Sequence, residues 1–167
     1  HFIVHTLEDG ILADILTAVR EKRMIRFENK SSRSGQVSTL SGVPLKIFVS
    51  TQTGRRYLGL YLPERRRFSN SRLDSITRVT LLEPCAFYEE VLRDLEKNKE
   101  KCWGLSFGSG TSRMEEVCIK LYIDEEKEPY ILNRLYREGR GGEIMKIREN
   151  QFLYTGTFFD TNEMLSW

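Results

Sequence analysis

The chain has 167 residues, of which 40% are hydrophobic and 30% are charged, and its formal net charge at pH 7 is +2. This composition is ordinary for a soluble globular protein, and no apolar run approaches the roughly 20 residues that cross a bilayer as a helix. The three cysteines, an odd number without metal-like spacing, indicate reduced thiols in a cytoplasmic protein. The composition therefore excludes a membrane-spanning protein and a disulfide-stapled secreted domain.

The charges divide unevenly between the two halves of the chain. Residues 1–83 carry 14 Lys and Arg against 8 Asp and Glu, whereas residues 84–167 carry 12 against 16. The basic first half favours an anionic partner there, although two solvated surfaces of opposite sign would give the same distribution.

The first half predicts one helix followed by short strands. Apolar residues between Ile11 and Val19 recur at a spacing of three and four, which is typical of one helix face, and Pro44 places the start of its strand near a sheet edge. This pattern predicts a small, strongly bent antiparallel sheet or barrel. In chain order, the expected elements are a helix over 11–21, a strand over 24–28, a loop or short exposed hairpin over 29–42, strands over 43–50 and 56–62 with a turn at 51–54, a strand from Phe68, a turn at 72–75 and a strand over 77–82.

The second half predicts a separate α+β unit. A charged connecting helix and a linker rich in Gly and Ser precede a strand, a helix and two further strands. This order is that of a ferredoxin-like domain that lacks its final strand. The expected ranges are 87–101 for the connecting helix, 104–112 for the linker, 117–123 for the strand, 126–138 for the helix, 144–148 and 152–159 for the later strands, and a last helix from Asn162.

The sequence contains no recognisable catalytic constellation. Its two histidines, His1 and His5, lie at the terminus, where they are more often frayed than metal-bound. The acidic run 124–126 lies where it would complement a helix N-terminus, which explains it without a cation. No nucleophile-and-base or phosphate-loop motif is present, so we expect no enzyme activity, no metal and no cofactor.

Arginine and aromatic residues concentrate in one part of the first half. The segments 54–58, 65–68 and 71–74 hold six arginines on neighbouring predicted strands, so we expect these side chains to converge on one small sheet. Arginine binds phosphate through paired donors, and aromatic rings stack on bases. The alternative is a solvated basic hairpin, with Arg72 held structurally by an ion pair to Asp74.

The order of several short motifs resembles a WYL domain, which is named for a Trp-Tyr-Leu triplet. The acidic second half resembles the WCX extension that commonly follows such a domain. The motifs are Val19-Arg20-Glu21-Lys22-Arg23, Ile25-Arg26-Phe27, Pro44-Leu45, Arg56-Tyr57-Leu58 and Arg72-Leu73-Asp74-Ser75-Ile76.

The resemblance implies an α+β architecture in which an Sm-like, SH3-type small β-barrel with a packed helix precedes the ferredoxin-like extension. Residues 1–9 would be a linker from an N-terminal helix-turn-helix module that is missing here, and residues 10–83 the WYL domain. Residues 84–112 would be the connecting helix and linker, and 113–167 a WCX-like domain, incomplete at its C-terminus.

The same resemblance implies the effector-sensing region of a bacterial transcription regulator, a cytoplasmic homodimer that does not contact a membrane. The effector would be a nucleotide or single-stranded nucleic acid, and duplex DNA would bind only through the module absent from this chain. A stand-alone Sm-like module that binds RNA or single-stranded DNA, and a dimerisation scaffold without ligand, remain the alternatives.

Residue by residue, the resemblance assigns ligand binding to an arginine and tyrosine groove. Three positions depart from the family pattern: Arg56 stands in place of Trp, Ser71 in place of Phe and Ser75 in place of a second arginine. The expected ligand-binding residues are Arg56, Tyr57, Arg65, Arg67 and Arg72, and the structural residues of the motif are Leu58, Leu73, Asp74 and Ile76.

Overall fold

A computed structural model describes residues 9–32, 34–50, 54–105, 107, 113–159, 161 and 164. The chain forms two compact units, His1–Asp94 and Leu95–Trp167, and the division falls within helix α2 (Tyr88–Lys99). The terminal histidines, most of the expected turn at 51–54, most of the linker at 104–112 and most of the expected last helix lie outside the described residues. The domain ranges expected from the sequence stay a prediction.

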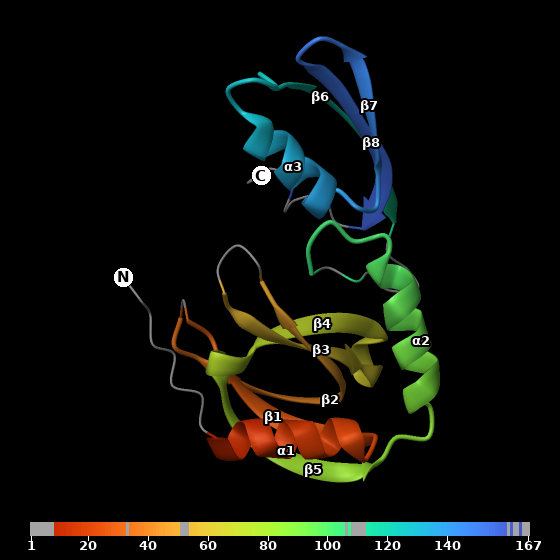
Figure 1. Cartoon of the computed structure of the whole chain (residues 1–167). Helices are drawn as coiled ribbons and strands as arrows, with labels where there is room; N and C mark the ends of the chain where they lie inside the picture. The colour runs from red at the N-terminus through yellow and green to blue at the C-terminus, as the bar shows by residue number, and fades with distance from the viewer. Residues whose placement is uncertain are drawn as a thin grey trace. The chain divides into compact units, whose positions relative to one another are not determined.

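The first unit is built on a five-stranded antiparallel sheet with the order β4-β3-β2-β1-β5 (Figure 1). The α+β class is therefore confirmed. The expected helix and strands are present, and the segment 29–42 forms a hairpin between two strands. The elements are α1 (Asp9–Arg20), β1 (Arg23–Lys30), β2 (Val37–Val49), β3 (Arg56–Leu62), the 3-10 turn η1 (Pro63–Arg65), β4 (Arg67–Arg72), the 3-10 turn η2 (Leu73–Ser75) and β5 (Ile76–Pro84).

Strand β2 is long because it serves two partners in succession. Its first half, Val37–Gly42, pairs with β1, and its second half pairs with β3. The register shifts between Pro44 and Lys46, which is the signature of a bulge, and a bulge bends its strand. At Pro44 the pairing of β2 with β1 has already ended at Gly42, so among the described residues β2 has only β3 as a strand partner there. A proline, which lacks the N–H for a second partner, fits this position.

The two end strands of this sheet are not paired with each other in the described part of the chain. Strands β4 and β5 end the order, and no pairing among the described residues joins them. The architecture is thus a bent antiparallel sheet with a packed helix, and closure into an Sm-like barrel stays a prediction.

The core of the first unit lies between α1 and one face of the sheet. Ile15 and Ala18 are fully buried on the apolar stripe of α1, which packs on β5, β1 and β2, and they share one core cluster with the alternating leucines of β3. Burial of an apolar side chain contributes roughly 1.5–3 kcal/mol, so this layer is the main source of stability in the unit. The buried core residues are Ile15, Ala18, Ile25, Phe27, Leu58, Leu60, Leu62, Leu73 and Ile76.

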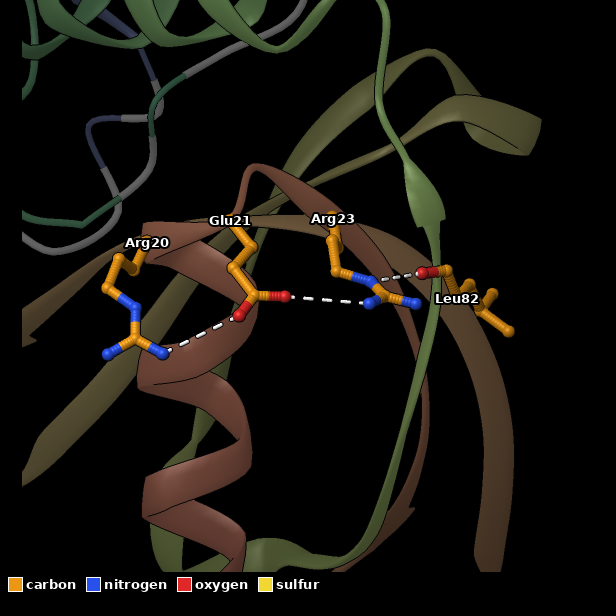
Figure 2. A network of polar contacts seen from close by, with 4 residues as sticks. All are labelled: Arg20, Glu21, Arg23 and Leu82. Atoms are coloured by element: carbon orange, nitrogen blue, oxygen red, sulfur yellow. Dashed lines mark hydrogen bonds and ion pairs between the residues drawn. The ribbon is translucent and has the colours of Figure 1, made fainter.

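A polar network links the end of α1 to β1 and β5 (Figure 2). Glu21 lies between two guanidinium groups, at 3.5 Å from Arg20 Nη2 and 3.5 Å from Arg23 Nη1. Arg23 Nε also donates a hydrogen bond of 2.6 Å to the carbonyl oxygen of Leu82 on β5. Arg23 therefore joins the first residue of β1 to the end of β5.

The segment from Cys85 to the beginning of α2 is joined to the rest of the first unit by three polar contacts. The phenol of Tyr88 donates to the carbonyl oxygen of Pro44 at 3.0 Å, and burial raises the pKa of this phenol. Lys22, in the left-handed region at φ 54°, forms an ion pair with Glu89 at 2.5 Å. Its carbonyl oxygen accepts the N–H of Cys85 at 2.8 Å.

The second unit contains β6 (Met114–Tyr122), α3 (Pro129–Glu138), β7 (Glu143–Arg148) and β8 (Gln151–Phe159). The sheet order is β6-β8-β7 and both pairings are antiparallel, so β6 and β7 run in the same direction with β8 between them. This is the split β-α-β arrangement of a ferredoxin-like half.

Helix α3 begins later than the expected residue 126. The carboxylate of Asp124 accepts the N–H groups of Glu126 and Lys127, each at 3.1 Å. A side-chain acceptor of this kind favours a turn over a helix, and the helix then begins at Pro129, where proline needs no N–H partner.

Aromatic rings and glycines fill the core of the second unit. Tyr154 and Phe158 stack at 6.0 Å between centroids, and Trp103 meets both rings edge-on. A Cβ at Gly142 would lie 2.5 Å from the Tyr154 ring, and a Cβ at Gly156 would lie 2.5 Å from the Phe158 ring. Only glycine lets the backbone approach these rings so closely.

Candidate functional site

The hairpin formed by β3 and β4 has one buried face and one face directed away from α1. Leu58 and its alternating neighbours Leu60 and Leu62 occupy the buried face. Tyr57, Gly59 and Tyr61 point to the opposite side because successive side chains of a strand alternate. We call this side the outer face; it is formed by Phe48, Tyr57, Gly59, Tyr61, Phe68, Asn70 and Arg72.

Tyr57 and Arg72 are direct neighbours across the two strands of the hairpin. The register pairs Tyr57 with Arg72 on β4 and with Phe48 on β2, so the three side chains form one row across the outer face. Side chains directly opposite in an antiparallel pair have Cβ atoms roughly 4.5–5.5 Å apart. All three are half-buried. This row provides two aromatic rings and a cation within the reach of one small ligand.

Arg72 is held in place by Asp74. Arg72 Nε donates to Asp74 Oδ1 at 3.0 Å and Nη2 donates to Oδ2 at 2.5 Å, which is the bidentate geometry of a strong pair. The hydrogen bond that Arg72 donates to Asp74 raises the pKa of Arg72 above its ordinary value. The pair uses two of the five N–H donors of the guanidinium, so three donors remain for other partners. Arg72 is therefore both fixed by a structural ion pair and able to bind an anion.

An aromatic group occupies the other end of the outer face. The rings of Tyr61 and Phe68 lie 5.4 Å apart edge-to-face, and Phe87, just before α2, lies 6.4 Å from Tyr61. Phe87 is 38% exposed, which is unusual for a phenylalanine in a packed cluster. Sequence reasoning did not assign these rings to the site. The alternation of side chains along β3 places Tyr61 on the same side as Tyr57, and this pattern could have assigned Tyr61 to the outer face from the sequence.

The turn between β3 and β4 carries three exposed arginines. Arg65 ends η1, Arg66 follows it in the left-handed region at φ 48°, and Arg67 begins β4. The register pairs Arg67 with Leu62 and Arg72 with Tyr57, so these two arginines lie at opposite ends of the hairpin. The structure thus brings Tyr57 and Arg72 together and leaves Arg65 and Arg67 at the other end.

Arg56 lies at the Tyr57 end of the hairpin. It pairs with Val49 on β2 and its side chain is exposed. The remaining residues of the motif are structural: Leu58, Leu73 and Ile76 are buried.

A family model described as the WYL domain matches residues 10–81. The chain contains a WYL domain. Among solved structures, the chain is similar to proteasome accessory factor B/C (PafBC) of Arthrobacter aurescens, with 15% identity and a TM-score of 0.44 over 93% of this chain and 22% of that chain. It is also similar to a CRISPR Cas-related protein, with 14% identity and a TM-score of 0.47 over 89% of this chain and 41% of that chain. No curated protein sequence matches. The chain thus spans less than half the length of either solved protein.

The structure shows where two of the positions that depart from the family pattern lie in this WYL domain. Ser71, which stands where the family has Phe, is 6% exposed and lies opposite Leu58 on the buried face. The space that a phenylalanine would fill is therefore in the core and not in the site. Arg56 stands where the family has Trp; its side chain is exposed and, because side chains alternate along β3, it lies on the side of Leu58 and not on the outer face with Tyr57.

The described residues support no metal site and no membrane span. Within those ranges, no three His, Cys, Asp or Glu side chains gather as metal ligands would. Among the helices that the structure describes, none combines the length and the hydropathy that a bilayer crossing requires.

Arg66 gives a stability prediction for the WYL domain, since an L-residue in the left-handed region is strained by roughly 1–2 kcal/mol and glycine is not. Arg66→Gly is expected to raise the free energy of unfolding by about 0.5 kcal/mol after the entropy cost of glycine. This corresponds to a rise of roughly 2–4 °C in melting temperature, measurable by circular dichroism. Arg66→Ala is the matched control, because it removes the same charge and keeps the strain. Equal melting temperatures for the two variants would contradict this explanation.

Proposed function

We propose that this chain is the effector-sensing region of a WYL-type transcription regulator. The effector is an anionic nucleotide or single-stranded nucleic acid that binds the outer face of the β3–β4 hairpin. Tyr57 stacks on a base, and Arg72 binds a phosphate. Binding of duplex DNA belongs to a module outside this sequence, and the protein acts in the cytoplasm as a homodimer.

The observation that carries the proposal is the row formed by Phe48, Tyr57 and Arg72. A guanidinium that is already fixed by Asp74 loses little side-chain entropy when it binds phosphate. An adjacent aromatic ring gives a stacking surface that accepts any base. A scaffold without a ligand would not need a cation in this position, since Arg72 and Asp74 could both be replaced by apolar residues.

Two finer features of the proposal concern the fold. The bend of β2 at Pro44, together with the sheet order, supports an Sm-like barrel with the hairpin on its surface. The split β-α-β order of the second unit supports a WCX-like extension after the WYL domain.

Substitution of Tyr57 tests the stacking role. Tyr57→Ala is expected to weaken the binding of a fluorescein-labelled thymidine oligonucleotide by roughly 1–3 kcal/mol, which is about 5- to 150-fold, whereas Tyr57→Phe keeps the ring and most of the affinity. Fluorescence anisotropy at low salt measures both. Tyr122→Ala is the control, because Tyr122 is an exposed tyrosine of the second unit. If Tyr57→Ala and Tyr122→Ala bind alike, Tyr57 does not stack on the ligand.

A further inference from the structure

The sheet of the second unit has one face that the described part of the chain leaves uncovered. Helix α3 packs on the other face (Figure 1), where its buried Leu135 belongs to one core cluster with Phe152 and Tyr154 of β8. Side chains alternate along each strand, so the intervening residues of β6, β7 and β8 point away from α3. We call this side the open face; its central residues are Cys118, Lys120, Tyr122, Glu143, Met145 and Leu153.

The open face exposes large apolar side chains. Tyr122 is 72% exposed, Met145 is 61% exposed and Ile147 is 45% exposed. The register sets Met145 and Leu153 side by side in one row across β7 and β8, and Tyr122 lies in the next row along the sheet. An exposed apolar patch on a folded domain that is bordered by charged residues marks an interaction surface.

The charges of the open face are sorted by sign along the strands. Glu143 lies in the row of Cys118, and Glu116 precedes that row by two residues of β6. Lys120 lies in the next row, and the register shift in β7 sets Arg148 one row further. The open face is therefore acidic in one half and basic in the other, and the division falls between Cys118 and Lys120.

A face with this pattern is complementary to itself. A second copy can be turned by a half rotation about an axis that runs across the strands between the two halves. Its basic half then lies opposite the acidic half of the first copy, and the two apolar centres meet, as in an isologous dimer. Two sheets that pack face to face lie about 10 Å apart, so the side chains of both form one layer. A nucleic acid would be repelled by the acidic half, so the charges favour a second copy as the occupant.

We propose that two copies of this chain associate through the open faces of their second units. This inference rests on the homodimer of the proposed function and names its interface. Strands of up to nine residues, three of them spaced by ~4.8 Å, give a face of roughly 400 Å² per copy. Interfaces of this size are at the low end for specific association, so we expect a reversible dimer with a dissociation constant in the micromolar range.

Charge reversal tests the complementarity. Lys120→Glu with Arg148→Glu gives an acidic variant of the open face, and Glu116→Lys with Glu143→Lys gives a basic variant. Each variant alone is expected to self-associate at least about tenfold more weakly than the original chain, because like charges then oppose each other across the interface. An equimolar mixture of the two variants should recover the dimer, since the two faces are again complementary. Sedimentation equilibrium of the whole chain at low salt measures all four samples.

Cys118 reports whether the association uses the open face. Its thiol is exposed, whereas Cys85 is buried and Cys102 is half-buried. Cys118 also lies beside the proposed axis, so dimerisation should cover it. Alkylation of Cys118 by iodoacetamide, located by mass spectrometry, should slow as the concentration of the original chain rises through the dissociation constant. The acidic and basic variants should each show a constant rate when alone and slowing when mixed.

Arg137→Glu with Arg140→Glu is the matched control for the acidic variant. It makes the same change in net charge at two exposed positions, one in α3 and one in the turn that follows it. Equal weakening of the dimer by this control would show that net charge alone sets the association, which overturns the interface. Melting temperatures show that each variant is folded, and the alkylation of the original chain tests the interface without any substitution.

The remaining failures separate the interface from the proposed function. A dimer that every variant leaves intact, with Cys118 alkylated at a constant rate, would overturn the interface and keep a homodimer formed through another surface. A chain that stays monomeric at every concentration would contradict the interface and the homodimer together. The titrations of the Tyr57 variants with an oligonucleotide test the effector site independently of both.

Discussion

Leu58→Ala is expected to lower the free energy of unfolding of the first unit by about 3 kcal/mol, the largest stability effect that the WYL motif offers. Leu58 is fully buried between α1 and the sheet, and truncation of a buried leucine costs roughly 2–5 kcal/mol because it leaves a cavity. Tyr57, its neighbour in the chain, is half-buried on the outer face, so Tyr57→Ala should cost much less.

Denaturant unfolding followed by circular dichroism measures the effect of Leu58→Ala, and the melting temperature should fall by on the order of 15 °C. Leu58→Met is the control, because a swap of similar volume usually costs less than about 1.5 kcal/mol. A smaller loss for Leu58→Ala than for Tyr57→Ala would mean that the two faces of β3 have been assigned the wrong way round.

Arg72→Ala is expected to weaken the binding of a six-nucleotide thymidine strand by roughly 10- to 150-fold. A hydrogen bond to a charged group contributes about 1.5–3 kcal/mol, and Asp74 already holds this guanidinium in position. Arg66→Ala should cost less, because Arg66 lies exposed in a turn and must be immobilised on binding. Arg72→Lys should recover only part of the affinity, since an ammonium lacks the paired donors.

The structural role of Arg72 has to be separated from its role in binding. Its side chain is 24% exposed and that of Asp74 is 15% exposed, so loss of either partner leaves a partly buried charge. Melting temperatures of Arg72→Ala, Asp74→Asn and the double variant give the coupling energy of the pair. If Arg72→Ala lowers the melting temperature but the folded variant binds the strand as tightly as the original protein, Arg72 is structural only.

The strongly periodic parts of the fold were predictable from the sequence. The alternation of Leu58, Leu60 and Leu62 predicted β3 with the bounds that the structure shows. The spacing of the apolar residues in α1 predicted a buried stripe that includes Ile15 and Ala18, but Leu16, which was expected on the same face, is 51% exposed. The ion pair between Arg72 and Asp74 was also among the sequence interpretations, because the two residues lie two positions apart at a packed turn.

Other features depend on information that periodicity does not contain. The bulge after Pro44, where β2 passes from pairing with β1 to pairing with β3, is a tertiary feature that periodicity does not contain. The expected convergence of Arg65, Arg67 and Arg72 ignored the register: a turn after Leu62 sets Arg67 opposite Leu62 and Arg72 opposite Tyr57. Phe48 and Phe87 could not be assigned to the outer face from the sequence, since they come from other elements.

The order of the strands in the first sheet also has a consequence for how the domain forms. Each pairing from β1 to β4 joins strands that follow one another in the chain, so the hairpin that holds Tyr57 and Arg72 closes over a short loop. Among the described strands of this sheet, only the pairing of β1 with β5 joins distant segments, from 47 residues apart at Asn29 and Ile76 to 61 at Arg23 and Pro84, and the entropy cost of closing a loop rises with its length. Ile25 and Leu81 therefore meet through the slowest contact of the unit. The β3–β4 hairpin can take shape before the domain around it is complete.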